Sequence, residues 1–212
     1  MRRGSTLASS ERWELCELLD RLGPDAPTLC LGWATRDLAA HLVLRERRLD
    51  AAVGIVLPTL AGYTASVQAR IARQPWPQLV GLVRDGPPWW SPYRLPALGD
   101  RFNTLEFFVH HEDVRRAQQS WQPRPYDPHR AAELWALLTR AAWLLYRPSP
   151  VGVVLRTPEG ARHTARRADR YVTVVGPVDE LTLHAFARQQ AQVELYGDPA
   201  DVRALRDSRR GW

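Results

Sequence analysis

The spacing of apolar residues changes once along this chain of 212 residues, and the change divides the chain into two regions. Up to about Arg147, apolar side chains recur every three or four residues, which is the period of a helix that buries one face. Further on, β-branched runs such as Val151–Leu155 and Tyr171–Val175 alternate with glycine and proline turns. We therefore expect a mainly α protein with a small α/β part, comprising a helical domain over residues 1–147 and an α/β domain over residues 148–212.

Helical spacing covers most of the first domain. It marks residues 11–22, a segment that starts at Thr35, and residues 60–71, 78–84, 103–118 and 130–146. In the second domain the pattern adds a helix over 179–190, a strand over 192–196 and a helix over 200–205. The Thr35 hydroxyl can cap the free amides of its helix, and Asp37 suits the positive end of the helix dipole.

The segment 86–98 breaks the helical pattern. It contains four prolines, which exclude a regular helix. It also contains the pair Trp89-Trp90, whose large apolar rings we expect other parts of the protein to cover. This tryptophan pair either lines the mouth of a pocket or plugs the surface of the helical domain.

The basic charge of the chain is carried by arginine alone. The net charge is +6, from 29 basic and 23 acidic side chains, and no basic residue is lysine. Proteins that bind nucleic acids usually use both residues, because lysine also pairs well with phosphate. The absence of lysine therefore indicates a GC-rich coding bias, and acidic residues are interspersed with the arginines. We expect no nucleic-acid partner.

Cysteine content and hydropathy point to a reducing compartment. The two cysteines, Cys16 and Cys30, could form at most one disulfide. No apolar run reaches the roughly 18 residues that a bilayer-spanning helix needs. Charged residues from Glu11 onward precede any hydrophobic stretch, which excludes a signal peptide. We expect a cytoplasmic protein without membrane contact, whose reduced thiols pack as inert apolar side chains.

One helical segment carries a pair of residues with the spacing of metal ligands. Glu106 and His110 are four residues apart, so they share one helix face, and Asp113 extends that face. His41, on the inward face of another segment, could supply a third ligand. Two histidines and one carboxylate form a catalytic zinc arrangement that also suits other divalent metals. At this point the alternatives stay open, because such a Glu-His pair is common by chance and an inward histidine is often a satisfied core residue. His111 points about 100° round the helix, toward a second layer of contacts or the surface.

Two stretches of sequence resemble a known superfamily. The residues GWATRDLAAHL at 32–42 resemble the GW-x-x-x-D-x-x-x-HL segment of the DinB-like metal-dependent helical bundles. The residues LEFFVHHEDV at 105–114 resemble their E-x-x-x-H-x-x-D-[LV] helix. The variant with glutamate first is similar to the mycothiol-dependent maleylpyruvate isomerase branch, and residues 175–188 resemble the second domain of that branch. Within the superfamily, the chain looks like an actinobacterial subgroup of uncharacterised metal-binding proteins.

The resemblance implies a fold and a set of site residues. The fold is a DinB-like four-helix bundle followed by a C-terminal α/β domain. The implied metal ligands are His41, Glu106 and His110, which would hold a zinc ion whose open position receives the sulfur of mycothiol or a water. Asp113 would steer an imidazole or a helix neighbour. Arg188 matches an arginine that reaches toward the anionic substrate, but the family pattern GR reads Ala187-Arg188 here, so a solvated helix arginine is an equal alternative.

From the ligand set and the resemblance we expect a divalent-metal-binding protein that uses a low-molecular-weight thiol. We expect an isomerase or S-transferase that acts on a small electrophile, as a monomer or homodimer. The GC-rich coding bias is typical of actinobacteria and favours mycothiol as the thiol. The alternative is a non-catalytic metal-binding or interaction protein that keeps the bundle without the chemistry.

Overall fold

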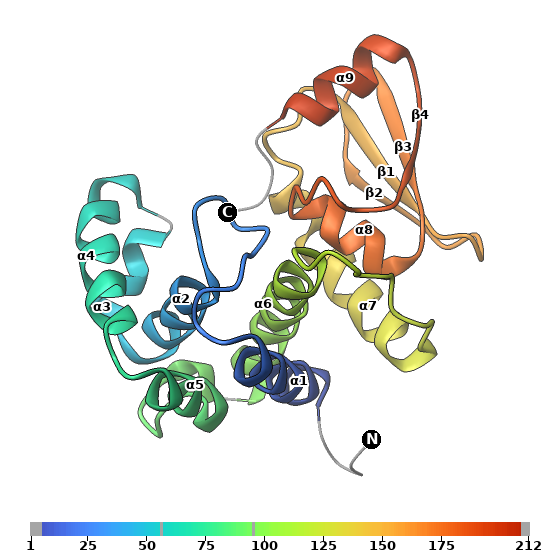
Figure 1. The fold of residues 1–212 in the computed structure, drawn as a ribbon. Coiled ribbons are helices and arrows are strands. Elements are labelled where there is room, and N and C mark those ends of the chain that lie inside the picture. The colour runs from blue at the N-terminus through green and yellow to red at the C-terminus, as the bar shows by residue number, and fades with distance from the viewer. Residues whose placement is uncertain (1–5, 56, 95, 209–212) are drawn as a thin grey trace. The chain divides into compact units, whose positions relative to one another are not determined.

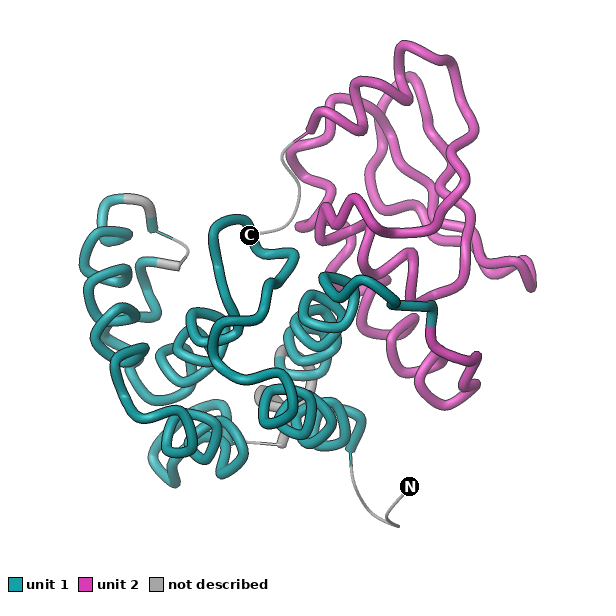
Figure 2. The backbone as a smooth tube through the Cα atoms, in the orientation of Figure 1, with its two compact units in different colours: residues 1–123 teal, residues 124–212 magenta. Residues whose placement is uncertain are grey.

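The chain folds into two compact units. A computed structural model describes residues 6–55, 57–94 and 96–208, and its backbone contacts separate residues 1–123 from residues 124–212 (Figure 2). The first unit is helical and the second combines helices with a four-stranded sheet, so the expectation of a mainly α chain with a small α/β part is confirmed. The outermost residues of both expected domains, 1–5 and 209–212, lie outside the described residues.

The first unit runs from α1 to α6 (Figure 1). Its elements are α1 (Leu7–Leu22), α2 (Thr35–Arg47), α3 (Leu49–Ala52), η1 (Val53–Ile55), η2 (Pro58–Leu60), α4 (Ala61–Ala72), α5 (Trp76–Asp85), η3 (Pro92–Arg94) and α6 (Pro96–Arg116). Helix α1 packs against α6 and α5, and α2 packs against α4 and α5. Their apolar faces form one core that includes Leu15, Leu19, Leu38, Leu42, Leu79 and Phe107. The four-helix bundle stays a prediction.

Helix α2 begins at Thr35, as the sequence predicts, but its cap and the start of α6 differ from expectation. The Thr35 hydroxyl does not cap α2; it donates to the Gly23 carbonyl at 2.6 Å. The Asp37 carboxylate instead accepts from the Ala34 amide at 3.0 Å, which fixes the first turn. Helix α6 begins at Pro96 rather than at Asn103, because a proline is well tolerated in the first turn of a helix, where its missing N–H would have had no partner.

The second unit contains a mixed sheet. Its elements are α7 (Pro128–Leu145), β1 (Gly152–Arg156), β2 (Arg162–Arg166), β3 (Tyr171–Val175), α8 (Val178–Ala185), β4 (Glu194–Tyr196) and α9 (Pro199–Asp207). The strand order is β2-β1-β3-β4, with β1 parallel to β3 and both outer pairs antiparallel (Figure 1). The sequence did not predict β2, because this edge strand is polar and only its Ala165 is buried.

Helix α7 belongs to the second unit, although the sequence analysis placed the boundary after residue 147. The helix packs against α8 and β2. The change in periodicity marks where strands begin, whereas the units divide where contacts become sparse, and the two positions differ by one helix.

Helix α8 ends earlier than the expected residue 190. Its last residue is Ala185, and Ala187 then adopts a φ of 60°, in the left-handed region that glycine favours. Arg188 therefore lies in the turn after α8, where its amide donates to the Leu183 carbonyl at 3.0 Å. The interpretation of Arg188 as part of a helix is wrong.

Among the described residues, no helix combines the length and the apolar character that crossing a membrane requires.

Arg12 joins α1 to three other helices of the first unit, α2, α5 and α6. Its Nη1 donates to Glu46 Oε2 in α2 and to the Val83 carbonyl in α5, both at 2.8 Å. Its guanidinium also lies over the Phe107 ring of α6, 4.0 Å from the centroid. The Glu46 side chain is 2% exposed, so the ion pair is shielded from water.

We expect the substitution Arg12→Met to lower the free energy of unfolding by about 3 kcal/mol, because it leaves the Glu46 carboxylate buried without its partner. Urea denaturation followed by circular dichroism measures the change. The control is Arg84→Met, which removes a partly exposed arginine from its pair with Asp20 and should cost less than about 1 kcal/mol. Equal losses in the two variants would contradict a special role for Arg12.

Candidate metal centre

The three residues with expected ligand roles converge inside the first unit. His41 comes from α2, and Glu106 and His110 come from successive turns of α6. Glu106 Oε1 lies 3.1 Å from His41 Nε2 and 3.2 Å from His110 Nε2. The three ligand atoms all lie within 4.8 Å of one another, and all three residues are buried.

The spacing of these atoms fits a metal ion. Bonds of about 2.0–2.2 Å around a tetrahedral zinc ion place neighbouring nitrogen and oxygen ligands about 3.3 Å apart. The two nitrogen-to-oxygen distances here, 3.1 and 3.2 Å, are close to that value. Two imidazole nitrogens and one carboxylate oxygen are also ligands that zinc accepts, so the donor set and its geometry both suit a divalent cation.

Arg45 keeps the Glu106 carboxylate ionised. Burial by itself would raise the pKa of Glu106, but the Arg45 charge and the hydrogen bonds from His110 and His41 outweigh it and hold the pKa well below its ordinary value. Arg45 Nε lies 3.7 Å from Glu106 Oε1. An anionic carboxylate is the form that binds a cation, so Arg45 favours the ligand form of Glu106.

The two histidines differ in their surroundings. Burial lowers the pKa of His41 below its ordinary value, although Glu106 opposes the shift. Burial also disfavours a charge on His110, but hydrogen bonds to Asp113, Cys30 and Glu106 outweigh it and raise its pKa well above the ordinary value. His110 Nδ1 donates to Asp113 Oδ2 at 3.0 Å. This bond leaves Nε2 facing Glu106 and His41, as a metal-binding imidazole requires.

Sequence reasoning missed several residues around this group. Arg45 donates to Asn103 Oδ1 at 2.6 Å and lies over the Tyr93 ring, 4.4 Å from its centroid. The Trp33 ring lies against His41, with the centroids 5.1 Å apart. The signal for Arg45 was its position four residues after His41, on the same helix face. Tyr93 carried no such signal, because its segment has no regular spacing.

Cys30 is not the inert apolar side chain that the sequence predicts. Its thiol donates to Asp113 Oδ2 at 3.2 Å, and its Sγ lies 3.9 Å from His110 Nδ1. Cys30, His110 and Asp113 form a second group of atoms close enough to hold a metal ion. Cys16, by contrast, is fully buried in the core of the first unit, as expected.

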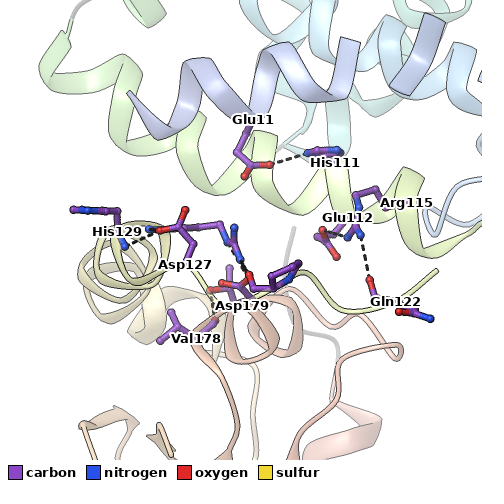
Figure 3. A network of polar contacts seen from close by, with 12 residues as sticks. Glu11, His111, Glu112, Arg115, Gln122, Asp127, His129, Val178 and Asp179 are labelled. Atoms are coloured by element: carbon purple, nitrogen blue, oxygen red, sulfur yellow. Dashed lines mark hydrogen bonds and ion pairs between the residues drawn. The ribbon is translucent and has the colours of Figure 1, made fainter. Parts of the chain in front are cut away.

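His111 turns away from His110 and is buried. Its Nδ1 donates to Glu11 Oε2 of α1 at 2.8 Å, so the surface interpretation of His111 is wrong (Figure 3). Glu14 lies close enough to this pair to form a third group of potential ligands, although Glu14 itself is exposed. One residue further along α6, the buried Glu112 carboxylate accepts from Arg115 at 2.6 Å (Figure 3).

The remaining candidates lie outside this cluster of contacts. Trp89 is 83% exposed, so it does not plug the helical domain, and Trp90 is 49% exposed. Whether the pair borders a pocket stays a prediction. Arg188 belongs to the second unit, and its catalytic role stays a prediction.

Comparisons with known proteins show the fold alone. No model of a protein family and no curated protein matches the sequence. Among solved structures, the chain is similar to a mycothiol-dependent maleylpyruvate isomerase with a TM-score of 0.62 and 16% identity, over 89% of this chain and 90% of that one. A histidine-to-alanine mutant of that enzyme matches over the same shares with a TM-score of 0.60. The chain therefore shares its overall fold with these isomerase structures.

The buried Cys16 thiol should be unreactive in the folded protein. Burial raises the pKa of the Cys16 thiol to about 12, so at about pH 8 almost none of it is the reactive thiolate. In the variant Cys30→Ser, which keeps only Cys16, we expect no labelling by a thiol-specific disulfide reagent until the protein is unfolded in guanidinium chloride. The released chromophore gives the count of reacted thiols. Labelling of the native variant at the rate of a free thiol would contradict the burial of Cys16.

Proposed function

We propose that this protein is a metal-dependent enzyme that uses a low-molecular-weight thiol to isomerise or transfer a small electrophile. It would bind one divalent cation, zinc, through His41, Glu106 and His110. The observation that carries the proposal is the convergence of these three ligand atoms within 4.8 Å in a chain with the fold of a thiol-dependent isomerase.

The residues around the ligands would prepare them for a cation. Arg45 keeps Glu106 anionic, and Asp113 accepts the His110 Nδ1 proton, so Nε2 is the ring atom that would meet a cation in place of a proton. When bound, a zinc ion would supply a Lewis acid that favours the deprotonated form of a thiol or water. The burial of all three ligands keeps bulk water from competing for the cation.

The thiol we propose is mycothiol, after the similar solved structure, whose name describes it as mycothiol-dependent. In a transfer, its sulfur would bond to the electrophilic carbon, its proton would leave to solvent, and the electron pair of the bond that breaks would depart with the leaving group. In an isomerisation, the sulfur would add to a carbon–carbon double bond and the π electron pair would move to the neighbouring carbon. Elimination would then use that pair to re-form the double bond, while the sulfur leaves with the electron pair of the carbon–sulfur bond. A thiol that works in its reduced form fits a cytoplasmic location.

Arg188 is the residue we propose for an anionic group of the substrate. The backbone supports this assignment, because Ala187 adopts a φ of 60°, which glycine would adopt without strain. The turn therefore keeps the conformation expected for the glycine of the family pattern, despite the alanine. A non-glycine residue in this region costs of order 1–3 kcal/mol, and such strain is often found at functional sites.

A second candidate is a non-catalytic metal-binding protein with the same fold. The observation that favours it is the departure from the family pattern at Ala187, beside the residue proposed to bind substrate. The two candidates share the metal site and differ in whether the thiol binds.

The metal site predicts its own stoichiometry. Purified protein that has been loaded with zinc and dialysed should retain about one equivalent, and His110→Ala should retain almost none, because only two protein ligands remain. Mass spectrometry of the metal content measures both. The control is His129→Ala, which removes an exposed histidine and should leave zinc unchanged. Full zinc content in His110→Ala would refute the site.

Thiol binding separates the two candidates. In titration calorimetry, we expect mycothiol to bind the zinc-loaded protein and not the protein stripped with a chelator, because the metal stabilises the thiolate. The disulfide form of mycothiol, which has no thiol to bind, serves as the control. Equal heats with and without zinc, or none at all, would favour the non-catalytic protein.

A further inference from the structure

The loop from Pro27 to Ala34 is fixed against α6 beside the proposed metal ligands. Pro27 and Ala34 form a β-bridge that closes the loop. Inside it, Thr28 Oγ1 donates to the Trp33 carbonyl at 2.8 Å. The Leu29 amide donates to the backbone carbonyl of Asp113 at 3.0 Å. The loop backbone is therefore held at the residue whose side chain contacts His110.

The Cys30 side chain adds a second contact at the same place. Its thiol donates to Asp113 Oδ2 at 3.2 Å, and this is the same oxygen that accepts from His110 Nδ1 at 3.0 Å. Because both donors share one oxygen, the thiol restrains the carboxylate in the orientation in which it meets the imidazole. The Asp113 side chain is 0% exposed, so water does not compete for that oxygen.

The other end of the loop contacts the other imidazole. The Trp33 ring lies against His41 at 5.1 Å between centroids and 45° between planes. One short loop therefore touches both histidines of the proposed metal site: Cys30 contacts His110 and its partner Asp113, and Trp33 contacts His41.

We propose that Cys30 is a positioning residue, which orients the His110 imidazole through Asp113 for metal binding. The inference rests on the proposed metal site. The geometry argues against a direct ligand role for Cys30, because Sγ lies on the Nδ1 side of His110 while Glu106 meets the Nε2 side. The two ring nitrogens point away from each other, so one ion does not bind both sets.

Variants of Cys30 test the proposal by metal affinity. Zinc affinity is measured by competition with a chromophoric chelator on the full-length protein. Partners of metal-binding histidines typically contribute 10–100-fold to affinity, so Cys30→Ala should bind zinc about tenfold more weakly. Cys30→Ser keeps a hydroxyl donor and should stay within about threefold of the unsubstituted protein. The control is Cys16→Ala, which removes the buried core thiol and should leave zinc affinity unchanged.

A cobalt spectrum provides a readout that a merely structural role would not move. We expect the visible bands of the Co²⁺-loaded protein to shift in Cys30→Ala and to return in Cys30→Ser, because they report ligand geometry. Affinity and bands in Cys30→Ala equal to those of the unsubstituted protein would overturn the proposal. An intense thiolate-to-cobalt band in the near ultraviolet that Cys30→Ser lacks would overturn it too, since Cys30 would then be a ligand. If His110→Ala also retains zinc, the proposed function itself fails.

Discussion

The first unit is organised by the need to pair buried carboxylates. Among the residues of this unit whose side chains the structure describes, five acidic ones are buried: Glu11, Glu46, Glu106, Glu112 and Asp113. A buried carboxylate without a partner costs several kcal/mol, so each must meet a cation or a strong donor. Arg12, Arg45 and histidines of α2 and α6 supply partners for four of them, and Glu112 pairs with arginines of its own helix. The pairs of Glu11 and Glu46, and two of the pairs of Glu106, join different helices. The positions of the helices therefore follow from charge pairing as well as from the apolar core.

The proposed metal site is a part of this pairing scheme in which three potential ligand atoms lie within 4.8 Å of one another. Glu106 is shared between Arg45 and two histidines, and its neighbour one turn further along the helix, His110, meets a second carboxylate on its other nitrogen. Carboxylates and neutral imidazoles attract positive charge, whether a proton or a metal ion. A site of this kind needs no change in the fold to bind a cation, because its donors are already held by neighbours on α2 and α6.

Local signals in the sequence predicted what depends on spacing along one element. The four-residue interval between Glu106 and His110 placed them on one face, and the inward stripe of α2 placed His41. The way in which the loop between α1 and α2 packs against α6 has no such signal. The contact of Cys30 with Asp113 could therefore not be predicted from the sequence. The same limit applies to the assignment of α7, since packing between elements decides which unit a helix joins.

Edge positions of the sheet explain why a polar segment forms a strand at all. Strand β2 completes the sheet by pairing with β1, yet it presents arginines at both of its ends, Arg162 and Arg166. An open strand edge can recruit the same edge of another molecule, and charged side chains along it make such recruitment unfavourable. Lysine is the residue most often found at such edges, and in this chain, which has no lysine, arginine provides the charge. The polar residues that kept β2 from being predicted as a strand thus include Arg162 and Arg166, whose charges disfavour edge-to-edge pairing of the sheet.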